Sequence, residues 1–137
     1  TVTEVPPGEL LARYLLPHDF DAALFGWSAL GDDPDPYGLW HSSQADGGYN
    51  LAGWSLPRAD ELLEAARQAR DRGERAARYA DFQRLFADEV PSIILYGPRY
   101  VLATAERVRV ELGPINRPAD RFRAIDRWSV EPLEAVG

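Results

Sequence analysis

The sequence predicts a layered α/β fold, because apolar runs of strand length alternate along the chain with segments of helical periodicity. Strand-like runs lie at residues 22–27 and 92–96, and turn residues bound each of them. Two amphipathic helices are expected between them, at about 57–71 and 74–89. With 137 residues, the chain has room for one modest domain or for part of a larger one.

The N-terminal elements follow from local signals. Residues 1–5 alternate and are β-branched, which predicts a short strand. Residues 8–16 place two leucines and a tyrosine on one helical face, and Pro17 ends that helix. The run at 22–27 is then the second strand.

A turn and a loop follow this strand. Residues 31–36 are rich in Asp and Pro, so we expect Asp33 or Asp35 to cap a short helix with Pro36 at its first position. Residues 42–53 are rich in Ser, Gly and Asn and predict an exposed loop.

The two central helices carry the clearest pattern. The first has acidic residues near its start and arginines near its end, which complements the helix dipole, and Gly73 is expected to break it. Its predicted inward face comprises Leu62, Leu63, Ala66 and Ala69. The predicted buried stripe of the second helix comprises Ala76, Tyr79, Phe82, Phe86 and Val90.

The C-terminal third is predicted to be strand-rich. Pro91 ends the second helix and leads into the buried strand at 92–96. Residues 100–112 alternate and predict one or two strands, and a further strand is possible at 122–130. These segments lack a core of their own, so we expect the chain to be a piece of something larger.

Composition excludes several classes of function. The net charge of −7 argues against a nucleic-acid partner, because phosphate binding needs a basic face. No run approaches the ~18 apolar residues of a membrane helix. The chain has no Cys, which excludes disulfides, thiolate chemistry and Cys-ligated metals. It starts TVTEVPP, with neither an initiating Met nor a signal peptide, so we expect a processed or truncated chain.

Several side chains allow both a structural and a functional interpretation. Trp27, at the end of a strand, either stacks on a ligand or fills the top of the core. Asp32, Asp33 and Asp35 suit a cation, but turn and helix-cap chemistry is the favoured interpretation. For His41 a structural role is favoured over ligand or metal contact. No metal site and no cofactor are predicted.

Catalysis is not predicted. Ser28 lies in the sequence GWSAL and lacks the G-x-S-x-G pattern of a nucleophile elbow. Neither His has an evident acidic partner nearby to orient it. Gly47-Gly48 lacks the spacing of a phosphate-binding loop. The chain is therefore not expected to be an enzyme, and a hydrolase using Asp or Glu residues is the weakest hypothesis.

Three segments together resemble one family. They read DFDAALFGWSALGDDPDPYGLWHSS from residue 19, GGYNLAGWSLPRADELLEAAR from residue 47 and ERAARYADFQRLFADEVPSIILYGPRYVLA from residue 74. In order and spacing they resemble the C-terminal part of the family 5 extracellular solute-binding proteins of ABC importers. This group contains oligopeptide-, dipeptide- and nickel-binding proteins. The resemblance covers about residues 19–109.

The resemblance implies part of a type II periplasmic-binding-protein-like fold, namely the C-terminal portion of its second lobe. Residues 1–112 would be a partial α/β lobe, and residues 113–137 a C-terminal return segment and polar tail. The implied function is non-covalent capture of a small solute, such as a peptide or peptide-like compound, by closure of two lobes. The implied partners are that ligand, an ABC transporter membrane permease and the missing first lobe. The implied location is extracytoplasmic, with a membrane anchor in the parent protein.

The resemblance also implies a binding site. In peptide-binding members the loop after the Gly-Trp pair lines the cleft, and here that loop begins with Gly26, Trp27, Ser28 and Ala29. A carboxylate three residues past the Trp grips the peptide's amino group in those members, but Leu30 occupies that position. Either Asp32 or Asp33 takes over this role, or the ligand has no free amino terminus there; Asp33 is included in the predicted site.

Two alternatives stay open. Tyr49, Asn50 and Trp54 either rim the cleft or pack against the neighbouring lobe. In a different class of function, the chain is a small stand-alone protein-interaction domain without a small-molecule ligand. Its binding patch would then comprise Trp40, Trp54 and Tyr49.

Overall fold

The computed structural model describes residues 2–27, 35–97, 99–115 and 117–132. The described chain divides into two compact units. The helical unit comprises residues 2–25 and 35–94, and the C-terminal unit comprises residues 26–27 and those from 95 onward. Each unit is described by itself.

The helical unit begins with α1, Pro7–Leu10, which continues as one π-helical turn over Leu11–Leu15. Proline at the first helical position starts α1, and Arg13 pairs with Glu9 at 2.6 Å one turn earlier. The helix predicted at 8–16 is confirmed. The strand predicted at 1–5 is wrong, because residues 2–5 form no strand and lie mostly exposed.

The next helix, α2, comprises Tyr37–Trp40 and is followed by a 3₁₀ turn, Ser42–Gln44. The predicted short helix is confirmed, although Pro36 is its N-cap residue and not its first helical residue. The prediction of an exposed loop at 42–53 is wrong near its end, where Asn50 and Leu51 are buried. Gly48 allows the close turn, since a Cβ there would lie 2.6 Å from the carbonyl oxygen of Gln44.

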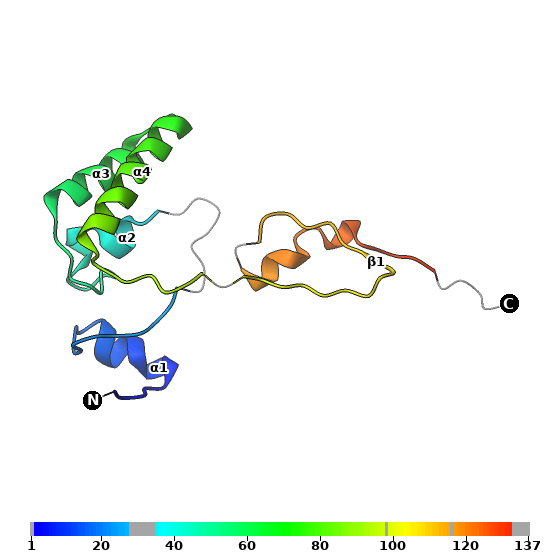
Figure 1. Cartoon of the computed structure of the whole chain (residues 1–137), viewed down its shortest axis with the longest axis horizontal. Helices are drawn as coiled ribbons and strands as arrows, with labels where there is room; N and C mark the ends of the chain where they lie inside the picture. Colours follow the sequence, from blue (N-terminus) through cyan, green and yellow to red (C-terminus); the bar gives the residue numbers. More distant parts are fainter. Residues whose placement is uncertain (1, 28–34, 98, 116, 133–137) are drawn as a thin grey trace. The chain divides into compact units, whose positions relative to one another are not determined.

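Two longer helices, α3 (Pro57–Gln68) and α4 (Arg72–Glu89), pack together and form the main body of the unit (Figure 1). Asp71 caps α4 by accepting a hydrogen bond from the Glu74 amide at 2.9 Å. Gly73 lies inside the first turn of α4 and does not break the first helix, which has already ended at Gln68.

The core of the unit lies between these helices. Its buried residues are Ala59, Leu62, Leu63 and Phe82, and half-buried side chains packed against it include Tyr37, Trp40, Trp54, Leu56, Tyr79, Leu85 and Phe86. The inward face predicted for α3 is confirmed at Leu62, Leu63 and Ala66. The stripe predicted for α4 is confirmed at its centre, but Ala76 and Val90 are exposed.

The strands predicted at 22–27 and 92–96 are not formed. Both runs carry the expected apolar residues, yet Leu24 and the side chains at 93–96 are exposed. A strand is stabilised by hydrogen bonds to a neighbouring strand. Within the ranges that the structure describes, no such neighbour lies beside either run. Both runs have the apolar composition of strands, but within the described residues neither pairs with another strand.

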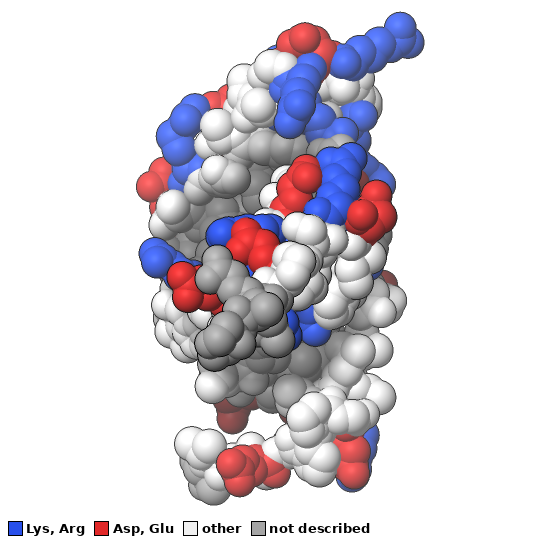
Figure 2. All heavy atoms as spheres, turned by 90° about the vertical axis from the view of Figure 1, so that its right-hand side faces the viewer, with Lys and Arg blue, Asp and Glu red and all other residues white. Residues whose placement is uncertain are grey.

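The C-terminal unit contains a short antiparallel pair, β1 (Val108–Arg109) with β2 (Ser129–Val130), in the register Val108↔Val130. Two 3₁₀ turns, Pro118–Phe122 and Ile125–Arg127, precede β2. The strands predicted at 100–112 and 122–130 are therefore confirmed only for the two residues of β1 and the two residues of β2. Two ion pairs lie in this unit, Arg109–Glu131 at 2.7 Å and Arg127–Glu111 at 2.8 Å. Figure 2 shows acidic and basic side chains interspersed on the face that it presents.

The regular elements of the described structure are thus mostly helices, and the predicted α/β sheet is reduced to this strand pair in the part of the chain that can be described. None of the described helices is both long enough and apolar enough to cross a membrane.

Candidate functional site

Two of the five predicted site residues lie in the described part of the chain. Apart from its own chain neighbours, no described residue places a heavy atom within 4 Å of the position where a Cβ of Gly26 would stand, so the described part of the chain leaves its backbone open on that side. Trp27 is 40% exposed and is therefore not part of the buried core. Ser28, Ala29 and Asp33 lie outside the described residues, as do Leu30 and Asp32.

The chain re-enters the described structure at Asp35, which is fixed to the helical unit at two points. One carboxylate oxygen accepts a hydrogen bond from the Tyr37 amide at 3.1 Å. The other lies 2.9 Å from Nε of Arg67, on α3. Turn chemistry, part of the favoured interpretation of this acidic cluster, is confirmed for Asp35, but the predicted cap is not, because Pro36 is the N-cap of α2 and the helix has no side-chain cap. The residue that ends the candidate loop is thereby held on α3.

A stack of three side chains supports this anchor. The Arg67 guanidinium lies over the Tyr37 ring, 4.2 Å from its centroid. The Tyr37 and His41 rings have centroids 4.1 Å apart and an interplanar angle of 23°. Arg67 thus holds Asp35 by charge and Tyr37 by a cation–π contact.

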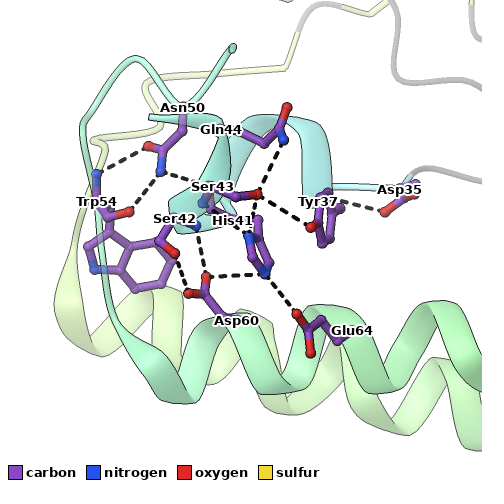
Figure 3. A network of polar contacts seen from close by, with 10 residues as sticks. All are labelled: Asp35, Tyr37, His41, Ser42, Ser43, Gln44, Asn50, Trp54, Asp60 and Glu64. Carbon is purple, nitrogen blue, oxygen red and sulfur yellow. Dashed lines mark hydrogen bonds and ion pairs between the residues drawn. The ribbon is translucent and has the colours of Figure 1, made fainter. Parts of the chain in front are cut away.

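His41 connects α2 to α3 (Figure 3). Its Nδ1 accepts a hydrogen bond from the Ser43 amide at 3.1 Å, and its Nε2 lies 3.2 Å from a carboxylate oxygen of Glu64 and 3.8 Å from one of Asp60. Because Nδ1 is an acceptor for a backbone N–H, the proton belongs on Nε2, which donates to Glu64. The structural role favoured for His41 is confirmed.

Ser43, His41 and Glu64 have the connectivity of a hydroxyl, a base and an orienting acid, since Ser43 Oγ lies 2.9 Å from Nδ1. The prediction that no acid lies near a histidine is therefore wrong; Glu64 is 23 residues away in sequence. However, Nδ1 of His41 already accepts a hydrogen bond from the Ser43 amide, and His41 is only 6% exposed. The geometry supports packing of α2 on α3 and not attack on a substrate.

A second contact between the same elements involves Asp60. Its two carboxylate oxygens accept hydrogen bonds from the Ser42 amide at 2.9 Å and from the Ser42 hydroxyl at 2.5 Å. Carboxylate acceptors make stronger hydrogen bonds than neutral ones. The 3₁₀ turn after α2 is therefore fixed to the first turn of α3.

Asn50 organises the loop between α2 and α3. Its side-chain amide donates to the carbonyl oxygens of His41 at 3.1 Å and Trp54 at 2.7 Å, and its oxygen accepts from the Trp54 amide at 3.1 Å. Asn50 is fully buried. The sequence analysis missed this role. The signal that could have indicated it is an asparagine in a glycine-rich loop, where an amide side chain commonly bonds to nearby backbone groups.

The aromatic side chains Trp40, Tyr49 and Trp54 differ in how far they are buried, and their predicted place at a cleft rim, a lobe contact or a protein-binding patch stays a prediction. Trp40 and Trp54 pack edge-on against Phe86, with ring centroids 4.6 and 5.9 Å apart. Tyr49 is half exposed. The two tryptophans therefore belong to the core of their own unit. Among the residues described, no group of three or more His, Asp or Glu side chains is placed to hold a metal ion.

The chain is similar to curated peptide-binding proteins. It is 32% identical over 110 residues to oligopeptide-binding protein AppA of Bacillus subtilis (strain 168), a match covering 80% of this chain and 20% of that protein. It is 33% identical over 101 residues to di/tripeptide-binding protein 4 of Pseudomonas aeruginosa (strain UCBPP-PA14), covering 72% of this chain and 19% of that protein. Di/tripeptide-binding protein 2 of the same strain is 31% identical over 83 residues, covering 58% and 15%.

The chain thus spans about a fifth of the length of the curated relatives that it matches. These relatives are named for what they bind and not for a reaction. No protein-family model matches the chain, and no solved structure matches it significantly.

Proposed function

We propose that this chain, which belongs to the family of oligopeptide- and dipeptide-binding proteins of the family 5 solute-binding type, forms part of the solute-binding component of an ABC importer. It contributes to the non-covalent capture of a peptide or peptide-like solute. The observation that carries this proposal is the match to an oligopeptide-binding protein over 80% of the chain.

The proposed setting is a type II periplasmic-binding-protein-like fold, in which residues 1–112 are part of the second lobe and residues 113–137 are a return segment and tail. The match to only a fifth of each relative supports this setting. The partners would be the first lobe of the parent protein and a membrane permease, and the location extracytoplasmic. Closure of two lobes on the solute would then provide capture by population shift, with no covalent step.

Within this setting the ligand contacts are Gly26, Trp27, Ser28, Ala29 and Asp33. The open backbone at Gly26 and the exposed Trp27 ring support this assignment. Backbone groups bind a peptide main chain without reading its side chains, and an aromatic ring adds contact area. Since Leu30 cannot neutralise an ammonium group, Asp33 is the proposed partner for a free amino terminus.

Isothermal titration calorimetry with matched peptides tests the proposal. Free and N-acetylated di- and tripeptides are titrated into the polypeptide encoded by the whole reading frame that includes this chain. We expect binding of at least one free peptide by that polypeptide and weak or no binding by this chain alone. Micromolar affinity for the chain alone would contradict capture between two lobes. Equal affinity for free and acetylated peptides would remove the amine-binding role of Asp33.

A further inference from the structure

We propose that the bond between Asp46 and Gly47 is a site of spontaneous covalent modification, at which the aspartate converts to isoaspartate through a cyclic imide. The bond lies in the loop between α2 and α3. The conversion would loosen the part of this loop that the Asn50 side chain organises. The inference concerns the chemistry of this chain's own backbone and does not rest on the proposed function.

The sequence first distinguishes this bond from every other aspartyl bond. Among the aspartates of the chain, Asp46 alone is followed by glycine. Ring closure requires the backbone nitrogen of the next residue to reach the side-chain carboxyl carbon of the aspartate. A side chain on that next residue hinders the approach, whereas glycine has no Cβ and allows a close approach of the backbone. The bond to Gly47 is therefore the aspartyl bond whose following residue hinders ring closure least.

The structure leaves the Asp46 side chain accessible. Asp46 and Gly47 are both exposed. The Asp46 carboxylate makes no hydrogen bond or ion pair with any residue that the structure describes. The carboxylates of Asp35 and Asp60, by contrast, accept hydrogen bonds from backbone amides. The Asp46 side chain can therefore turn toward its own backbone without breaking a contact to a described residue.

The attacking nitrogen is not part of a hydrogen-bond ladder. The Ala45 amide donates to the Ser42 carbonyl oxygen at 3.0 Å, and the Asn50 amide donates to the Gln44 carbonyl oxygen at 3.0 Å. Between these two amides, those of residues 46–48 donate to no carbonyl oxygen of the described chain. A backbone amide held in secondary structure becomes available only after local opening. The Gly47 nitrogen needs no such opening.

The conformation of Gly47 explains why a glycine follows Asp46. Its φ is 72°, in the left-handed region that favours glycine. Apart from its chain neighbours, no described heavy atom lies within 4 Å of the position where a Cβ of Gly47 would stand. The described part of the chain thus leaves space beside the bond for the imide ring. The turn requires the glycine, and the reactive aspartyl bond is a consequence of that requirement.

The conversion needs no co-reactant other than water. The Gly47 nitrogen bonds to the side-chain carboxyl carbon of Asp46, and the carboxyl hydroxyl leaves with the amide proton as water. Water then adds to the imide and breaks one of its carbon–nitrogen bonds. Cleavage at the side-chain carbonyl restores aspartate. Cleavage at the main-chain carbonyl leaves Gly47 attached through the side chain of residue 46, which is isoaspartate.

The loop beyond the bond has no slack to absorb this change. Isoaspartate lengthens the main chain by one methylene group. Gly48 lies so close to Gln44 that a Cβ on Gly48 would stand 2.6 Å from the Gln44 carbonyl oxygen. The Asn50 amide donates to that same oxygen at 3.0 Å. A longer backbone before Gly48 must displace this close turn, so we expect the hydrogen bonds of the buried Asn50 to weaken.

Incubation of this chain at neutral pH and physiological temperature, followed by peptide mapping, tests the inference. Electron-transfer dissociation distinguishes isoaspartate from aspartate, and an isoaspartyl methyltransferase labels the same product. The reference is the free peptide SQADGGYNL, which is residues 43–51 of the chain. In the chain, folded by circular dichroism, we expect isoaspartate at position 46 to form within about tenfold of the rate in the peptide, because little local opening is needed. Slower formation than this would overturn the inference.

An internal control and a variant separate the chemistry from general exposure. Asp21 is also exposed, but Ala22 follows it, so isoaspartate at position 21 should form several-fold more slowly than at position 46. Equal rates at the two positions would overturn the role of Gly47. Asp46→Glu keeps the charge but would have to form a larger ring, so the product at position 46 should disappear.

Urea denaturation of fresh and aged chain tests the effect on the loop. The aged chain, enriched in isoaspartate at position 46, should unfold at a lower urea concentration than the fresh chain. Asp46→Glu aged under the same conditions should keep the midpoint of its own fresh sample, which excludes other damage as the cause. Equal midpoints for the fresh and the isomerised chain would overturn the inferred link between this bond and the contacts of Asn50.

Discussion

Replacement of Asn50 by alanine is expected to be the most destabilising single change in the loop between α2 and α3. The substitution removes three hydrogen bonds at a fully buried position, two to carbonyl oxygens and one from the Trp54 amide. A typical hydrogen bond contributes about 1 kcal/mol net, and a buried group left without a partner costs about 1–3 kcal/mol. The expected loss in unfolding free energy is therefore about 3 kcal/mol, a large share of the roughly 5–15 kcal/mol of an ordinary domain.

Urea denaturation followed by far-ultraviolet circular dichroism measures this loss. With a slope of about 2 kcal/mol per molar urea, Asn50→Ala should lower the midpoint by about 1.5 M at an unchanged slope. Asp46→Ala is the matched control, because Asp46 lies in the same loop and is exposed; its effect should stay within about 0.5 kcal/mol. If Asn50→Ala costs less than about 1 kcal/mol, the loop is not held by this side chain and the reasoning fails.

Three further predictions follow from single contacts. Arg67→Lys keeps the charge opposite Asp35 but loses the guanidinium stack on Tyr37, so it should cost about 0.5–1 kcal/mol in urea denaturation, and no loss would show that the stack contributes nothing. Val90→Gly should raise the unfolding free energy measured by urea denaturation by about 0.5–1 kcal/mol, because glycine adopts the left-handed conformation without strain. A lower unfolding free energy would contradict strain at this position. Trp27→Ala should weaken peptide capture by the whole polypeptide by about 1–3 kcal/mol in calorimetry, and an unchanged dissociation constant with an intact fold would remove Trp27 from the site.

The helices could be predicted from the sequence because their signals are local. The period of the apolar residues in α3 and α4 and a capping aspartate before α4 lie within a few residues of each other. The end of α4 at Glu89 was predicted from Pro91, but the left-handed conformation of Val90 could not be, since nothing in the sequence indicates it. The end of α3 was predicted less well, at about residue 71 and not at Gln68, because terminal turns carry weaker signals than the helix interior.

The strands could not be predicted in the same way because pairing depends on distant residues. The apolar runs at 22–27 and 92–96 have the composition of strands, but composition does not provide a neighbour. The only strand pair in the described ranges, β1 with β2, joins residues from the alternating stretch at 100–112 and from the further strand suggested at 122–130. The sequence pattern identifies segments able to form strands, whereas the sheet depends on what else is present.

The polar network was the part of the site that sequence reasoning missed most. Glu64 and Asp60 reach His41 and Ser42 only because α3 packs beside α2, and those contacts bridge 18 to 23 positions. The turn role of Asp35 was predictable, since an aspartate side chain commonly accepts a hydrogen bond from the backbone amide two residues later.

The network gives the candidate loop one fixed end. Positions 28–34 run into Asp35, which Arg67 holds on α3, and α3 in turn is packed on α4 through Leu63 and Phe82. A binding loop with a fixed end has less conformational freedom to lose when it closes on a ligand. Substitution of Arg67 should therefore weaken capture through loop ordering, with the loss falling on the entropy of binding. Substitution of Trp27 removes apolar contact area instead, so the Trp27 variant should show a smaller heat-capacity change on binding. Calorimetry at several temperatures separates these two effects, and a heat-capacity change altered equally by both variants would contradict the distinction between an anchor and a contact.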